Sequence, residues 1–188
     1  MPLIASVDVC GIEHIPLTGP ALLIANHISN VDPFCLVAYI PRHFHGMAKQ
    51  GLFRHPLSNV ILSGFEPIRV RRDGGDRRAL REAEQYLRQG ALVMVFAEGT
   101  RSKTGDMQEA RAGGVFLAQR TGAPIVPIAF SGTNRIFKKR FPWYSRCRVR
   151  MRVGEPFFLA DLNDTAHHNR HDLAQAVMAR VSRLLPPT

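Results

Sequence analysis

Residues 25–34 read Ala-Asn-His-Ile-Ser-Asn-Val-Asp-Pro-Phe, and they join an apolar run at 21–25 to a second one at 34–40. A short apolar run directly after a Gly-Pro pair predicts a buried strand. The second run predicts a short helix, Pro33–Ile40, because proline favours the first position of a helix. The residues between the two runs therefore form a turn that leads from a strand into a helix.

The turn carries an imidazole and a carboxylate, those of His27 and Asp32. On one continuous helix the two side chains would point about 140° apart and could not meet. In a turn, the carboxylate can accept the Nδ1–H of the imidazole and leave Nε2 free as a base. Asp32 before Pro33 is also a good helix cap, and a histidine in a turn is commonly only solvated. From the residues alone, both interpretations stay open.

Composition predicts a single domain over residues 1–188 and limits its partners. The net charge is +10, which favours nucleic acid, anionic lipid headgroups or phosphorylated substrates without choosing among them. The 3 cysteines are far apart, which argues against a disulfide framework and a metal site and suits a reducing cytosol. No apolar run approaches the ~20 residues of a membrane-spanning helix.

Apolar strand patterns alternate with amphipathic helix patterns along the whole chain. Strands are expected at 7–15, 21–25, 43–49, 68–70, 92–96, 123–130 and 146–153. Helices are expected at 33–40, 52–62, 76–89, 111–118 and 172–185. The pattern predicts an α/β fold, in which helices flank a mostly parallel central sheet and the last helix packs on it.

Four sequence blocks carry a family resemblance. Asn26 and His27, followed by Asp32, resemble the N-H-x-x-x-x-D motif of the glycerolipid acyltransferases, the 1-acyl-glycerol-3-phosphate acyltransferase family. Residues 97–102, Ala-Glu-Gly-Thr-Arg-Ser, resemble the family's F-P-E-G-T-R block with alanine in place of proline. Val-Pro-Ile at 126–128 resembles the V-P-[VI] block. The resemblance implies the glycerol-3-phosphate acyltransferase-like α/β fold.

The remaining block lies between these, and the resemblance as a whole covers about residues 7–160. Its matching positions are Lys49, Leu52, Phe53 and Pro56. The family's spacing from that proline leads to Arg72, which the resemblance associates with the acceptor's phosphate. A forked guanidinium suits a phosphate group. A shift of one to three residues would move the role to Arg71 or Arg69, and a solvated basic turn is the alternative.

The resemblance implies transfer of a fatty acyl group from an acyl thioester, acyl-CoA or acyl carrier protein, to the free hydroxyl of lysophosphatidic acid or a similar lysolipid. His27, oriented by Asp32, is the implied general base. The implied substrate-binding residues are Asn26, Arg71, Arg72, Glu98, Gly99, Thr100 and Arg101. No cofactor or metal is expected, because a thiol with a pKa of ~8.5 leaves without strong acid help.

Two details of the 97–102 block stay open. The oxyanion donors are not evident from the sequence, and backbone N–H groups near Gly99 are the expected candidates. Without the resemblance, Glu98 and Arg101 would be interpreted as a surface ion pair of little energetic value. The acyl chain length, the acceptor headgroup and the thiol carrier are not determined.

Bases and aromatic residues mix at 136–144, and arginines alternate with apolar residues at 146–153. The mixture is typical of an interfacial membrane contact, of a single-strand nucleic-acid platform or of a surface loop with buried rings. The basic strand face can extend a lipid contact or protect a sheet edge.

Family members often carry an apolar N-terminal helix pair, whereas this chain begins almost at its first strand. We therefore expect a cytoplasmic enzyme that binds peripherally to the anionic inner face of the membrane through residues 136–152, with no nucleic-acid partner. The alternative function is a non-catalytic basic module on an acyltransferase scaffold, which binds anionic lipid or nucleic acid.

Overall fold

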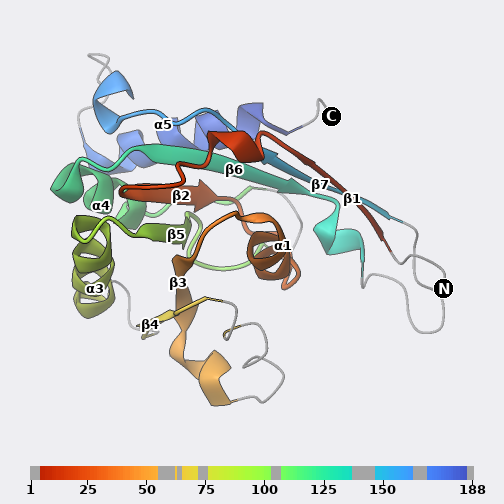
Figure 1. Cartoon of the computed structure of the whole chain (residues 1–188), viewed down its shortest axis with the longest axis horizontal. Helices are drawn as coiled ribbons and strands as arrows, with labels where there is room; N and C mark the ends of the chain where they lie inside the picture. The colour runs from red at the N-terminus through yellow and green to blue at the C-terminus, as the bar shows by residue number, and fades with distance from the viewer. Residues whose placement is uncertain are drawn as a thin grey trace.

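The structure, a computed structural model, describes residues 5–54, 62, 65–71, 76–102, 107–136, 147–162 and 169–185. In this part of the chain a 7-stranded sheet runs in the order β1-β7-β6-β2-β5-β3-β4 (Figure 1). The strands are β1 (Ala5–Cys10), β2 (Ala21–Ala25), β3 (Phe44–Lys49), β4 (Ile68–Val70), β5 (Leu92–Phe96), β6 (Ile125–Ser131) and β7 (Cys147–Val153). Neighbouring strands pair in parallel except β6 and β7, which are antiparallel.

Helices cover both faces of the sheet (Figure 1). They are α1 (Asp32–Tyr39), α3 (Arg77–Arg88), α4 (Gly113–Thr121) and α5 (Arg170–Arg183). Short 3-10 turns lie at η1 (Ile12–His14), η2 (Gln50–Arg54), η3 (Thr133–Arg135) and η4 (Leu159–Leu162). The expected α/β class, a mostly parallel sheet flanked by helices, is confirmed.

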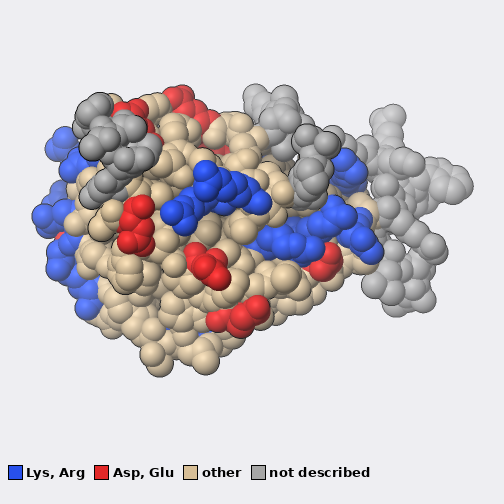
Figure 2. Space-filling view, turned by 90° about the horizontal axis from the view of Figure 1, so that it is seen from above, with Lys and Arg blue, Asp and Glu red and all other residues tan. Residues whose placement is uncertain are grey.

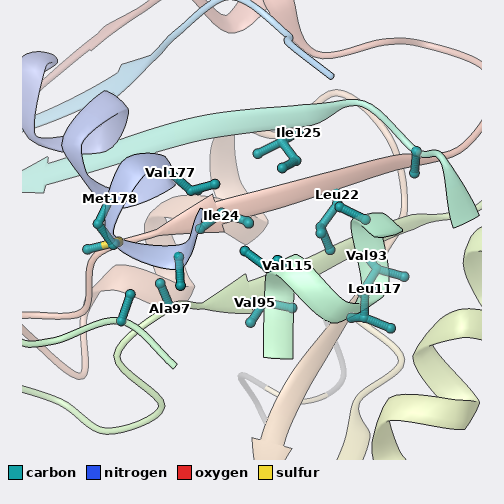
Figure 3. Close-up of a cluster of buried hydrophobic side chains, with 14 of the residues drawn as sticks. Leu22, Ile24, Val93, Val95, Ala97, Val115, Leu117, Ile125, Val177 and Met178 are labelled. Atoms are coloured by element: carbon teal, nitrogen blue, oxygen red, sulfur yellow. The ribbon is translucent and has the colours of Figure 1, made fainter. Parts of the chain in front are cut away.

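The sheet separates two apolar clusters, because alternate residues of a strand point to opposite faces. Leu22 and Ile24 of β2 pack with Val115 of α4 and Val177 of α5, as the close-up of this cluster shows (Figure 3). Leu23 of β2 belongs to the second cluster, which includes side chains of α1. β2 is thus buried on both faces, which explains its uninterrupted apolar sequence.

Two expected elements differ from the structure. The strand expected over 7–15 ends at Cys10, because Gly11 has a φ of 81° and turns the chain into η1. The carbonyl of Val153 occupies the space where a Cβ would lie at position 11, so a side chain there would clash. The helix expected over 52–62 is a 3-10 turn, η2, in its described first part, and most of the remainder lies outside the described residues.

The arginine-rich strand is interior to the sheet. β7 pairs with β1 on one side and β6 on the other, so the proposal that its arginines protect a sheet edge is wrong. Arg152 is bound to Asp8 of β1, with 2.7 Å between its Nη2 and the Asp8 Oδ2, and this pairing neutralises part of the basic face. The edge strand on this side of the sheet is β1.

The carboxyl ends of β2, β3, β4, β5 and β6 meet at one edge of the sheet, because these strands run in the same direction. Ligands in open α/β sheets bind at this edge. His27 follows β2, and Glu98 follows β5.

Candidate active site

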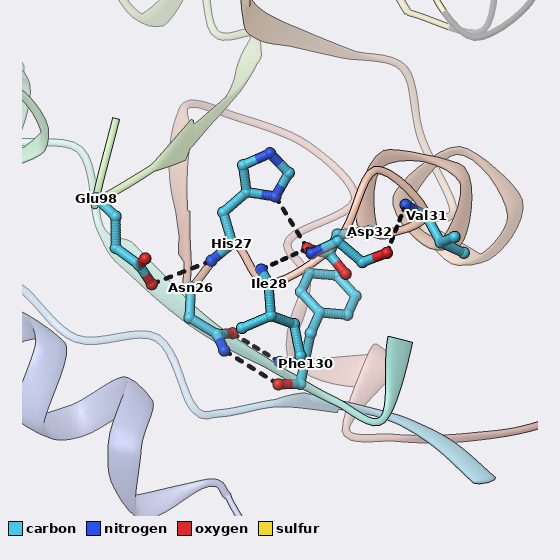
Figure 4. Close-up of polar contacts among 8 residues, drawn as sticks. Asn26, His27, Ile28, Val31, Asp32, Glu98 and Phe130 are labelled. Carbon is cyan, nitrogen blue, oxygen red and sulfur yellow. Dashed lines mark hydrogen bonds and ion pairs between the residues drawn. The ribbon is translucent and has the colours of Figure 1, made fainter. Parts of the chain in front are cut away.

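The turn between β2 and α1 closes around the buried carboxylate of Asp32 (Figure 4). One oxygen, Oδ2, lies 2.9 Å from the Nδ1 of His27 and accepts the backbone N–H groups of Ile28 and Ser29 at 2.8 Å each. Val31, rather than Asp32, occupies the cap position of α1, and its side chain caps nothing. The hydrogen bond expected between His27 and Asp32 is therefore present, and the carboxylate holds the turn that precedes it.

Two contacts fix the imidazole of His27. Its ring stacks on that of Phe96 at the end of β5, with 4.0 Å between the centroids and 19° between the planes. With Nδ1 directed at Asp32, the second nitrogen, Nε2, faces away from the carboxylate (Figure 4). The side chain is 17% exposed, so part of the ring is open to solvent.

Asn26 attaches the end of β2 to β6. Its Nδ2 donates to the carbonyl of Phe130 at 3.0 Å, and its Oδ1 accepts the N–H of the same residue at 2.7 Å. Both ends of the buried amide are therefore used by backbone groups (Figure 4). This anchoring role was missed from the sequence, because Phe130 lies 104 residues away and no local pattern marks it as a partner.

The loop after β5 binds the backbone of His27 on both sides. The Oε1 of Glu98 accepts the N–H of His27 at 3.2 Å, and the N–H of Ser102 donates to the carbonyl of His27 at 2.8 Å. Glu98 is 3% exposed, whereas Arg101 is exposed, so the interpretation of the two as a surface ion pair is wrong. The other oxygen of Glu98, Oε2, has no hydrogen-bond partner among the described residues.

Burial raises the pKa of the Glu98 carboxyl above its ordinary value, and the backbone N–H groups of His27 and Gln108 oppose that shift only in part. A buried carboxylate oxygen without a partner can accept a hydrogen bond from a ligand hydroxyl. The arrangement at Glu98 is therefore suited to a polar ligand beside His27.

The two residues that follow Glu98 shape the loop. Gly99 has a φ of 66° and donates its N–H to the carbonyl of Phe96 at 3.0 Å. Thr100 lies with its hydroxyl 3.5 Å from the side-chain oxygen of Gln108. Since Gly99 and Ser102 both donate to backbone carbonyls, neither of these N–H groups is available as an oxyanion donor.

The structure places some of the bases expected to bind a phosphate. Arg71 is exposed just beyond the end of β4, and its backbone N–H donates to Asp76 at 2.8 Å. The guanidinium of Arg69 lies 4.4 Å from the centroid of the Phe53 ring. Arg72 lies outside the described residues.

Other chemistries receive no support from the described residues. No three His, Cys, Asp or Glu side chains within this part of the chain come close enough to hold a metal ion. Burial raises the pKa of the Cys35 thiol to about 11, so this thiol on α1 is protonated at neutral pH and a poor nucleophile. Among the helices that the structure describes, none is long and apolar enough to cross a membrane.

Comparison with known proteins identifies relatives of this chain. A family model described as Acyltransferase matches residues 6–131. A 1-acyl-sn-glycerol-3-phosphate acyltransferase of Borreliella burgdorferi is 27% identical over 181 residues, which cover 95% of this chain and 71% of that protein. The mouse 1-acyl-sn-glycerol-3-phosphate acyltransferase alpha is 32% identical over 151 residues, which cover 77% of this chain and 53% of the mouse protein. This chain thus spans about half the length of the mouse relative.

A solved structure is also similar. The crystal structure of the 1-acyl-sn-glycerophosphate (LPA) acyltransferase PlsC from Thermotoga maritima superposes with a TM-score of 0.74 at 26% sequence identity, covering 96% of this chain and 71% of that chain. The family match extends over more than half of this chain and includes both the His27 turn and the Glu98 loop. The chain therefore belongs to the glycerolipid acyltransferase family, and the expectation of an enzyme that resembles the 1-acylglycerol-3-phosphate O-acyltransferases is confirmed.

Proposed function

We propose that this protein transfers a fatty acyl group from an acyl thioester to the free hydroxyl of lysophosphatidic acid or a similar lysolipid. The observation that carries the proposal is the hydrogen bond of 2.9 Å between the His27 Nδ1 and the buried Asp32 carboxylate. The names of the relatives support the substrate class, because they act as 1-acyl-sn-glycerol-3-phosphate acyltransferases.

His27 acts as the general base. Asp32 accepts from Nδ1–H, which leaves Nε2 unprotonated and directed away from the carboxylate. Nε2 takes the proton of the acceptor hydroxyl as the oxygen attacks the thioester carbonyl. The C–S bond breaks, and the thiolate leaves and takes up a proton. A thiol with a pKa of ~8.5 is a good leaving group, so the step needs no metal and no covalent enzyme intermediate.

The acceptor is held by groups at the carboxyl edge of the sheet. The Oε2 of Glu98, which is without a partner among the described residues, accepts from a glycerol hydroxyl. Arg101 and Arg71 are exposed at the same edge and are suited to an anionic headgroup. Holding the acceptor beside His27 makes the attack effectively intramolecular, which is a large part of the rate enhancement.

The test is an assay for the release of free thiol, with palmitoyl-CoA or palmitoyl-acyl carrier protein as donor and lysophosphatidic acid as acceptor. We expect thiol release that depends on the acceptor, with phosphatidic acid as the product identified by mass. A panel of other lysolipids and donors determines the headgroup and the thiol carrier. Thiol release without an acylated lipid product would instead indicate a thioesterase.

A non-catalytic basic module is the rival function, and the net charge of +10 favours it. A binding module has no need of a buried carboxylate that orients an imidazole, so the geometry at Asp32 favours the enzyme. Absence of any acyl transfer from the full donor and acceptor panel, together with tight binding to anionic vesicles or single-stranded nucleic acid, would support the rival.

The enzyme further binds peripherally to the anionic inner face of the membrane. Lys and Arg side chains gather in patches with carboxylates among them on the face that Figure 2 views from above. On β7, Arg148 and Arg150 form no ion pair with a described residue, while Arg152 is bound to Asp8. Flotation with vesicles that contain phosphatidylglycerol tests this proposal: binding at low salt that weakens as salt rises is expected, and no binding at low salt would contradict it.

A further inference from the structure

The side chain of Arg111 lies across Gly99, in the loop that binds His27. A Cβ built on Gly99 would lie 2.7 Å from the Cδ of Arg111, 2.8 Å from its Nε and 3.3 Å from its Cζ. The backbone N–H of Arg111 donates to the carbonyl of Ala97 at 2.9 Å, which fixes the residue beside the loop. The absence of a side chain at Gly99 thus leaves room for a guanidinium at this position.

The same loop also contacts His27. Phe96 stacks on the His27 ring, and the carboxylate of Glu98 accepts the N–H of His27. Arg111 contacts the loop at Ala97 and Gly99, so residues 96–99 contact both the arginine and the histidine. A ligand that lies next to the ring and extends along this loop can therefore contact the guanidinium of Arg111.

The charge of Arg111 is not used elsewhere in the described part of the chain. Arg88 and Arg120 are paired with Glu84, and Arg152 is paired with Asp8. Arg111 is exposed, and no carboxylate of the described residues lies within ion-pair distance of it. An arginine that is held in place by packing and lacks a carboxylate partner is suited to an anionic ligand.

We propose that Arg111 contacts the phosphate of the acceptor and determines the preference for phosphorylated acceptors, an inference that rests on the proposed function. In lysophosphatidic acid the phosphate is attached to the carbon next to the one that carries the hydroxyl. A hydroxyl within reach of the His27 Nε2 therefore brings the phosphate close to the same loop. The guanidinium of Arg111 donates to two phosphate oxygens in the forked geometry typical of arginine.

The experiment compares two acceptors that differ only in the phosphate, lysophosphatidic acid and monoacylglycerol with the same acyl chain. The measured quantity is the ratio of their kcat/KM values. Arg111→Met keeps the alkyl chain over Gly99 and removes the charge. We expect it to lower the ratio roughly 10- to 100-fold, the loss expected for a hydrogen bond to a charged group, mainly through KM for lysophosphatidic acid. Arg111→Lys is expected to restore part of the ratio.

Arg81→Met is the matched control, because Arg81 is an exposed arginine on α3 and its removal changes the net charge by the same amount. The control is expected to leave the ratio unchanged. An equal loss of activity toward both acceptors in Arg111→Met would show that Arg111 only supports the loop, and an unchanged ratio would show that it contacts no phosphate. Either result overturns the inference. Arg111→Gln is the second variant if Arg111→Met does not fold.

A binding measurement separates this inference from the proposed function. If the wild-type protein acylates no acceptor, the proposed function fails, and titration calorimetry with sn-glycerol 3-phosphate decides on Arg111. Binding to the wild-type protein that weakens about tenfold or more in Arg111→Met supports the inference. Equal binding to both proteins, or binding to neither, overturns it.

Discussion

The His27 turn and the β1–β7 strand pair each hold a carboxylate against a basic side chain, and they differ in burial. Asp32 has no exposed surface and accepts donors from three residues of its own turn. Asp8 is 43% exposed and binds Arg152, although the contact of 2.7 Å is shorter than the 2.9 Å at His27. The length of the contact alone therefore does not show how firmly each carboxylate orients its partner. A buried carboxylate with several donors fixes an orientation, whereas an exposed pair is screened by water and salt.

Removal of the imidazole or its carboxylate is the largest expected effect. We expect His27→Ala and Asp32→Asn each to lower kcat/KM by ~10²- to 10⁴-fold, because the general base of the proposed mechanism is lost. Thiol release with lysophosphatidic acid measures the loss, and circular dichroism checks the fold. His171→Ala, at an exposed histidine on α5, is the control and keeps its activity. Retained activity in Asp32→Asn would show that the buried carboxylate is not needed to orient His27, and Asp32 would then differ from Asp8 only in burial.

Asn26 extends the comparison from activity to stability. Asn26→Ala leaves the N–H and the carbonyl of Phe130 buried without partners, which costs roughly 2–5 kcal/mol in the free energy of unfolding. Urea denaturation measures this change. Asn30 is an exposed asparagine in the same turn, so Asn30→Ala is expected to stay within about 0.5 kcal/mol of the wild type. Similar losses for both variants would mean that burial does not separate the two positions.

Glu98 gives the buried region a pH dependence of its own. Burial raises the pKa of its carboxyl in the folded protein, so the folded protein binds this proton more tightly than the unfolded chain does. The stability of the wild type relative to Glu98→Gln therefore rises as pH falls through the raised pKa, and levels off below the ordinary pKa of glutamate. Thermal melts of both proteins across this range measure the difference. A relative stability that falls over the same range would contradict the raised pKa.

Asp8 has the opposite sign and the smallest expected effect. The hydrogen bond from Arg152 lowers the pKa of the Asp8 carboxyl, so its contribution is present above the ordinary pKa of aspartate. The contribution is lost as pH falls through the lowered pKa, and Asp8→Asn is then no less stable than the wild type. Salt reduces the effect because the pair is exposed. Thermal melts of both proteins at low and high salt test this. A stability difference between them that salt does not change would show that the Asp8–Arg152 pair is shielded from solvent.

Local patterns predicted most of the fold and the centre of the candidate site. The apolar runs gave β2 and β5 their positions, and Asp76 is the observed N-cap of α3, where its side chain accepts from Arg78 and Ala79. The strand–turn–helix pattern around residues 25–34 predicted that His27 and Asp32 could meet, since their contact lies within one turn.

Contacts between distant segments could not be predicted from the sequence. The N–H of His27 lies 71 residues from Glu98, and the amide of Asn26 lies 104 residues from Phe130. Alternation of arginine with apolar residues showed that 147–153 forms a strand with one apolar face, but it carries no information about neighbours. The position of β7 inside the sheet, antiparallel to β6, depends on which edges remain available after the other strands have paired.

The position of β7 has a consequence for how the chain is completed during synthesis. In the described sheet β1 pairs with β7 alone, so the first strand of this sheet to be synthesised waits for one that emerges some 140 residues later. The strands that carry His27 and Glu98, together with β6, have all emerged before then. The nascent chain can thus assemble its His27 turn first, while two unpaired strand edges remain exposed to chaperones or to neighbouring chains until β7 pairs with both.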